Sequence, residues 1–224
     1  MVGYEESALE PSREAKEVYA RWLNYLDEEF TKHRKPELRG ELVRDNLHQL
    51  LLGRPHGGKL NFTLTTELPF NVLQLSLDPV NVTLEAECEG GVDEGKYASV
   101  KPLIWFWQMF DRSTVGLNHW LGFRFRAMLG KHIFKKIGKN VKIYHGVEFG
   151  YGYNLTIEDD CVIHKYARLE DCWEIVLKKG TTIAAYAAVY SLAGDTAGYR
   201  VVECLGAGSV PGARPTPDSG QGRL

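Results

Sequence analysis

Bulky apolar residues recur every six positions in the second half of the chain, in three groups that start twenty positions apart. An α-helix repeats every 3.6 residues and a simple strand every two, so neither accounts for this spacing. The pattern predicts a chain wound as a triangular coil, in which each face contributes one apolar side chain to a shared core. The nine inward positions are Ile137, Ile143, Phe149, Ile157, Ile163, Leu169, Leu177, Ile183 and Val189.

The first half of the chain has other patterns. Apolar residues four apart between Val18 and Phe30 predict a helix capped by Ser12, and Pro36 fits the first turn of a second helix. Apolar and polar residues alternate at 60–64, 73–77 and 80–84, which predicts short strands. Helical spacing returns over 97–111 and again up to about residue 136.

These patterns divide the chain into four parts. We expect a helical and short-strand leader region (1–113), a capping helix (114–136), the repeat region (137–192) and a poorly ordered tail (193–224) that is rich in Gly, Pro and Ser. The ends of a stacked coil expose unpaired backbone groups, so the helix ending near Lys136 is expected to cover the first end. Three repeats are about the minimum for stability, which favours burial against other copies.

Composition narrows the classes of function. The 224 residues carry a formal charge of -2, with 44% hydrophobic and 25% charged residues, as in ordinary globular proteins. A near-neutral balance argues against a nucleic-acid binder. The acidic start has no apolar signal region, which predicts a cytoplasmic protein, and the longest apolar run, Pro102 to Phe110, is too short to span a bilayer.

A local group of basic residues lies on the last predicted helix. A solvated face is the simpler interpretation, and contact with an anionic cofactor or a lipid surface is the alternative. The group comprises Arg124, Arg126, Lys131, Lys135 and Lys136.

The segment Gly138 to Ser191 resembles the hexapeptide-repeat acyltransferases. Within that family it looks most similar to the maltose and galactoside O-acetyltransferases, because Tyr151 to Ile157 (YGYNLTI) is similar to their GYN signature and Ile175 to Ser191 to the coil that follows. The resemblance implies a mainly β chain: a left-handed parallel β-helix of about three coils after a mixed helical and extended N-terminal region. It also implies a homotrimer that transfers acetyl from acetyl-CoA, a co-substrate, to a hydroxyl of a sugar or similar small molecule.

The resemblance also suggests site residues. The family's catalytic histidine follows the third coil, where this chain has Gly194, which cannot accept a proton. His164 points outward beside an inward residue and is the candidate substitute base. Tyr153, Asn154 and Asp171 are candidates for binding the acceptor.

Other interpretations of the same residues remain open. His164 can be a surface or subunit-contact histidine, and Tyr153 and Asn154 can simply shape a turn. Loss of the family histidine favours a truncated, catalytically inactive scaffold or interaction protein. A zinc hydratase is a weaker alternative, because His145 and His164 are nineteen positions apart in a twenty-residue coil and have no third partner. No metal ligand is therefore assigned.

Overall fold

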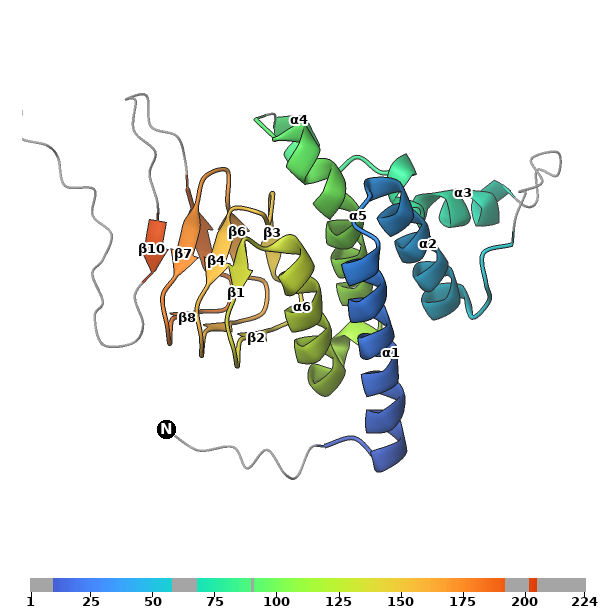
Figure 1. The fold of residues 1–224 in the computed structure, drawn as a ribbon, viewed down its shortest axis with the longest axis horizontal. Helices are drawn as coiled ribbons and strands as arrows, with labels where there is room; N and C mark the ends of the chain where they lie inside the picture. The colour runs from blue at the N-terminus through green and yellow to red at the C-terminus, as the bar shows by residue number, and fades with distance from the viewer. Residues whose placement is uncertain (1–9, 58–67, 90, 192–201, 205–224) are drawn as a thin grey trace, which may run out of the picture.

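The computed structural model describes residues 10–57, 68–89, 91–191 and 202–204, in which a helical region precedes a stack of short strands (Figure 1). The helical region contains α1 (Arg13–Lys32), α2 (Pro36–Leu52), α3 (Leu68–Ser76), η3 (Pro79–Asn81), α4 (Glu85–Glu89), α5 (Glu94–Asp111), η4 (Val115–Leu117) and α6 (His119–Ile133). The strands are β1 (Lys136–Ile137), β2 (Lys142–Ile143), β3 (Glu148–Phe149), β4 (Leu155–Ile157), β5 (Val162–Ile163), β6 (Arg168–Glu170), β7 (Ile175–Leu177), β8 (Thr182–Ile183), β9 (Ala188–Tyr190) and β10 (Val202–Cys204).

Aromatic side chains build the core of the helical region. The Ser12 hydroxyl accepts a hydrogen bond from the backbone N–H of Ala15 and so caps α1, as its position in the sequence predicts. Trp22 of α1 stacks on Phe125 of α6, with ring centres 5.6 Å apart, and meets Phe106 of α5 edge-on.

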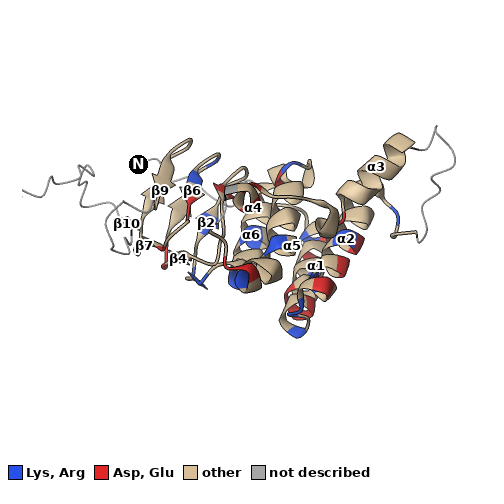
Figure 2. Ribbon diagram, turned by 90° about the horizontal axis from the view of Figure 1, so that it is seen from above, with Lys and Arg blue, Asp and Glu red and all other residues tan. Residues whose placement is uncertain are grey.

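In Figure 2, acidic and basic residues are interspersed along α1 and α2 rather than separated by sign.

The strands expected in the leader region are not found in its described part. Residues 60–64 lie outside the described residues, and α3 replaces the strand expected at 73–77. Asn71, Gln74 and Leu77, three positions apart, are the buried residues of this segment, whereas Leu73 and Leu75 are exposed. The alternation of leucines was misleading because polar side chains form most of the inner face of this helix.

The strands form three parallel sheets through which the chain passes in turn. The sheet orders are β1-β4-β7-β10, β2-β5-β8 and β3-β6-β9. Ile137 pairs with Ile157, and Ile157 with Leu177, so the chain returns to the same face after twenty residues. This arrangement, called the coil below, is compatible with a parallel β-helix. Helices contain more of the described residues than strands do, so the expectation of a mainly β chain is not confirmed.

The nine expected inward residues share one core. Seven of them are buried, and Ile137 and Val189, at the two ends of the series, are partly buried and pack against the same cluster. Direct stacking in a parallel ladder explains this result, because equivalent residues of successive turns lie opposite one another.

The coil extends further on one face than the sequence suggests. Strand β10 pairs with β7, with Cys204 opposite Leu177, although residues 193–224 were expected to be a poorly ordered tail. The backbone N–H of Lys178 donates to the Cys204 carbonyl, which also accepts from the Thr181 hydroxyl. The other residues of the expected tail lie outside the described residues.

Helix α6 joins the two regions. It contacts β1 and β2 on one side and α1 on the other, the position expected for a helix that covers the first end of the coil (Figure 1). Arg126 of α6 forms an ion pair with Asp111 at 2.6 Å and donates to the carbonyl oxygens of Gly116 and Ile143. The second Asp111 oxygen accepts from the backbone N–H of Gly146. Arg126 is 1% exposed, so its expected place on a solvated basic face is wrong.

Candidate functional site

The site residues expected from the sequence lie at two different corners of the coil. His164 follows β5, where the chain passes from the second sheet to the third. Asp171 follows β6, and Tyr153 and Asn154 precede β4, where the chain passes from the third sheet to the first. The structure therefore brings Tyr153, Asn154 and Asp171 together and leaves His164 at the other end of the strands of the third sheet. Gly194 lies outside the described residues.

Asp171 is the most buried of these four residues, with no exposed surface. Its Oδ1 accepts hydrogen bonds from the backbone N–H groups of Gly150 (3.1 Å) and Tyr151 (2.8 Å), whereas its Oδ2 has no partner among the described residues. Burial raises the pKa of Asp171 to about 6, although the backbone hydrogen bonds favour the ionised form. The carboxyl group therefore holds the corner of the first turn, and its second oxygen is buried.

Asn154 and Tyr153 also hold this corner. The Asn154 side-chain amide donates to the carbonyl oxygens of Asp171 (2.8 Å) and Cys172 (3.2 Å), which ties two successive turns together. The Tyr153 hydroxyl accepts from the backbone N–H of Asp93 at the start of α5, and the Lys96 ammonium lies 5.7 Å from the centre of its ring. Burial raises the pKa of Tyr153. These contacts support the turn-shaping interpretation of both residues.

The corner that carries His164 is aromatic. The imidazole of His164 stacks on Tyr144, with ring centres 5.0 Å apart, and no described carboxylate makes an ion pair with it. Tyr144 meets Phe123 of α6 edge-on at 4.8 Å. His164 is neither fully exposed nor buried, so solvent can reach it.

Two tyrosines at this corner adopt an unusual backbone conformation. Tyr166 and Tyr186 have φ values of 59° and 61°, at the position that glycine (Gly146) occupies one turn earlier. A bulky residue with positive φ is uncommon and costs roughly 1–2 kcal/mol. The two rings stack with their centres 5.2 Å apart, and both tyrosines are exposed. Tyr166 also contacts the ring of His145.

His145, a weaker candidate from the sequence, has a more perturbed environment than His164. Burial and the neighbouring Arg126 charge lower the pKa of its imidazole, which keeps the ring neutral at pH 7. Its Nδ1 is buried with no hydrogen-bond partner among the described residues. A neutral imidazole can accept a proton, but this nitrogen faces the protein interior rather than solvent.

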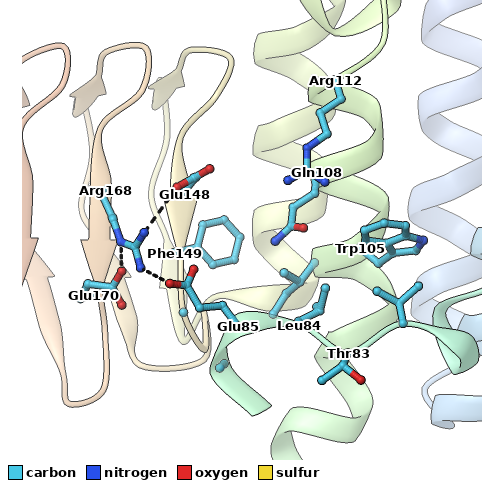
Figure 3. A pocket seen from close by; sticks show the side chains of 14 residues that line it. Thr83, Leu84, Glu85, Trp105, Gln108, Arg112, Glu148, Phe149, Arg168 and Glu170 are labelled. Carbon is cyan, nitrogen blue, oxygen red and sulfur yellow. Dashed lines mark hydrogen bonds and ion pairs between the residues drawn. The ribbon is translucent and has the colours of Figure 1, made fainter. Parts of the chain in front are cut away.

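A cleft that no sequence pattern indicates lies between the helical region and the third sheet and is called the inter-region cleft (Figure 3). Its volume is about 280 Å³, and residues of 82–86, α5, β3 and β6 line it. Arg168 of β6 forms ion pairs there with Glu85 (2.8 Å), Glu148 (3.8 Å) and Glu170, so three carboxylates surround one guanidinium. The hydrogen bond to Glu85, opposed by partial burial, raises the pKa of Arg168.

The ion pairs at the inter-region cleft chiefly connect the helical region to the coil. Glu85 belongs to α4, and the next acidic residue of that helix, Glu87, pairs with Lys101 of α5 at 2.8 Å. The segment is thus attached to the helical region by one carboxylate and to the coil by the other. An excess of carboxylates disfavours the phosphates of a coenzyme A molecule, so this cleft is a poor candidate for binding the co-substrate that the resemblance implies. Nothing in the sequence pairs Glu85 with Arg168, which lie 83 positions apart in the chain.

Metal and membrane sites are not evident in the described part of the chain. It contains no group of three or more His, Cys, Asp or Glu side chains placed to hold a metal ion. None of its helices combines the length and the apolar character needed to cross a bilayer. Comparisons with protein-family models, curated proteins and solved structures find no match for this chain.

Proposed function

We propose that this protein is a hexapeptide-repeat acyltransferase: a cytoplasmic, homotrimeric, acetyl-CoA-dependent O-acetyltransferase that acts on a hydroxyl of a sugar or similar small molecule. Its coil would then be a left-handed parallel β-helix. The main support is the register of twenty residues with nine apolar side chains in one core, together with the YGYN corner at residues 151–154.

In this proposal His164 acts as the general base. Its imidazole removes the proton from the acceptor hydroxyl, whose oxygen forms a bond to the thioester carbonyl carbon. The C–S bond then breaks, and the leaving thiolate takes the proton back from the imidazolium. Hydrogen-bond donors stabilise the negative charge on the carbonyl oxygen between these steps. Tyr144, which stacks on His164, fixes the plane of the imidazole.

The proposed trimer accounts for the separation of the site residues. Within one chain, His164 and the group Tyr153, Asn154 and Asp171 lie at opposite ends of the strands of the third sheet. A neighbouring copy can place its own second corner opposite His164, so that a complete site forms only between chains. Sedimentation velocity is expected to give three times the 25.3 kDa mass of one chain.

An assay of thiol release tests the activity. The protein is incubated with acetyl-CoA and a panel of sugars, and free thiol is measured. His164→Ala is expected to lower the rate by roughly 10²- to 10⁴-fold, as for loss of a positioned base. The matched control is His33→Ala, since His33 follows α1 in the helical region. Unchanged turnover in His164→Ala would remove this residue from the mechanism.

A catalytically inactive scaffold is the second candidate, and specific contacts favour it. Asp171, Asn154 and Tyr153 all make hydrogen bonds within the fold, and His164 lacks an orienting carboxylate among the described residues. A trimer without thiol release for any acceptor in the panel would support this second proposal. A stable monomer would argue against both.

A further inference from the structure

A second cleft, called the basic cleft, lies within the helical region. It forms where the carboxyl end of α1 and the start of α2 meet α5 and α6, and its volume is about 550 Å³. None of its residues belongs to the coil or to the proposed acyl-transfer site. Its lining consists of Asp27, Thr31, Arg34, Arg39, Ser99, Lys131 and His132.

Arg39 is the central residue of the basic cleft. It is 6% exposed, and its guanidinium donates to the carbonyl oxygens of Ser99 (2.7 Å), His33 (3.2 Å) and Phe30 (3.4 Å). Two of these carbonyls are at the end of α1, where helical carbonyls lack intrahelical partners, so Arg39 also stabilises that end. No described carboxylate lies within 4.0 Å of the guanidinium, so a positive charge is buried without a counter-ion. Such burial is unfavourable unless an anion compensates it.

The other charges of the basic cleft do not supply that anion. The Asp27 carboxylate is bound by Lys131 (3.0 Å) and His132 (2.7 Å). Burial lowers the pKa of His132 despite this contact, so its imidazole adds no positive charge at pH 7. The lining thus has three cationic side chains and one carboxylate. Because Asp27 pairs with Lys131, the positive charges of Arg34 and Arg39 have no compensating negative charge in the cleft.

The charge of Arg34 also acts on Arg39. Burial and the nearby Arg34 charge lower the pKa of Arg39, as expected for neighbouring cations that repel. Arg34 is exposed and makes no ion pair with a described residue. A ligand with two negative charges would relieve this repulsion and compensate the buried guanidinium.

We propose that the basic cleft binds a small molecule through a phosphate group, which Arg39 and Arg34 contact. A phosphate monoester carries about −1.5 to −2 charges at pH 7, which matches the two uncompensated cations, whereas a single carboxylate would match only one. Planar guanidinium groups also bind phosphate oxygens in pairs. The cleft is larger than a phosphate group, so its ligand is a phosphorylated organic molecule. This proposal is independent of the acyl-transfer proposal.

Isothermal titration calorimetry of the full chain tests the proposal, with pyrophosphate, phosphate and acetate as probes at constant ionic strength. Both phosphates are expected to bind, and acetate at least tenfold more weakly. Arg34→Gln is expected to weaken phosphate binding about tenfold, because a charged hydrogen-bond donor is lost. The control is Lys32→Gln, which removes a nearby exposed cation that pairs with Glu29 outside the cleft, and it is expected to change affinity less than twofold.

A second variant examines the buried residue itself. Arg39→Lys keeps the charge but loses the planar fork, so it is expected to weaken phosphate binding by more than Arg34→Gln does. Circular dichroism first establishes that the variant is folded. If it is not, the comparison of Arg34→Gln with Lys32→Gln decides alone. The proposal is overturned if the unmodified protein binds neither phosphate at millimolar concentration, if acetate binds equally well, or if both exposed variants lose the same affinity.

Discussion

In the coil, Ile143, Ile163 and Ile183 lie opposite one another on successive strands, and each fills the same place one turn later. In the helical region, Trp22 is parallel to Phe125 and nearly perpendicular to Phe106, and no spacing along the chain repeats these contacts. The interior of the coil therefore follows from a local period, whereas the helical core depends on residues far apart in the sequence. Substitutions in the two regions should therefore lower the stability of the protein in different ways.

The largest expected effect is at the joint between the two regions. Asp111→Asn removes the charge that compensates the buried Arg126 and weakens the link to the coil at Gly146. We expect a loss of about 3–5 kcal/mol in the free energy of unfolding, as for breaking a buried ion pair. Urea denaturation followed by tryptophan fluorescence measures it.

The control for this change is Asp45→Asn, which breaks the more exposed ion pair with Arg44. It is expected to cost at most about 1 kcal/mol. If the two variants lose the same stability, Asp111 does not couple the regions as proposed.

The next effect tests the repeated interior. Ile163→Ala empties a fully buried position in the middle turn of the coil, with an expected cost of about 2–5 kcal/mol. Val162→Ala changes the neighbouring side chain, which points outward on the same strand and is only partly buried, and is expected to cost clearly less. Thermal denaturation compares the two variants, and equal losses would contradict the inward and outward assignment.

A third prediction concerns pH. The folded pKa of Asp171, about 6, lies above the unfolded value of about 3.9, so the folded state binds more protons between these values. This group contributes its full stability below about pH 4 and loses it as the pH rises through 6, by roughly 3 kcal/mol in total. Asp171→Asn should remove this pH-dependent contribution to stability, because an amide does not titrate. The amide oxygen can still accept hydrogen bonds from the backbone N–H groups of Gly150 and Tyr151. Urea titrations from pH 4 to 8 that give parallel curves for both proteins would refute the assignment.

The smallest expected effect is the difference in stability between alanine variants at two glycines with almost equal φ values, Gly146 (72°) and Gly180 (73°). A Cβ at Gly146 would lie 2.5 Å from the Tyr166 ring, whereas a Cβ at Gly180 would meet no atom within 4 Å. Both alanine variants incur roughly 1–2 kcal/mol of backbone strain. Gly146→Ala should cost about 1 kcal/mol more because the ring must move. Equal melting temperatures would indicate that the tyrosine adapts without cost.

The sequence predicts the coil well because a bulky apolar residue in a fixed period marks each inward position, as Ile157 and Ile163 illustrate. It predicts α3 wrongly because the buried face of that helix contains Asn71 and Gln74, so an apolar pattern cannot reveal it. The burial of Arg126 and the pairing of Glu85 with Arg168 were also missed. Both depend on contacts between residues distant in the chain, which carry no local signal.

The candidate site was predicted only in part. The structure places Asp171 and Asn154 in hydrogen-bond contact because they lie close to one repeat apart, and their role in binding an acceptor stays a prediction. His164 was assigned to the same site by resemblance, although a single chain places it at another corner. Arg39 has no motif around it, and only the folded arrangement of four helices reveals its uncompensated charge.

The fourth strand of the first sheet, β10, shows that the length of chain between paired strands can vary. Twenty-seven positions separate Leu177 from its partner Cys204, whereas twenty separate Ile157 from Leu177. The two intervals nevertheless give the same parallel pairing, since strand pairing constrains the ladder positions and not the length of chain between them. Insertions between turns are thus compatible with an unchanged interior, which leaves such segments open to evolutionary change while the ladder residues stay constrained.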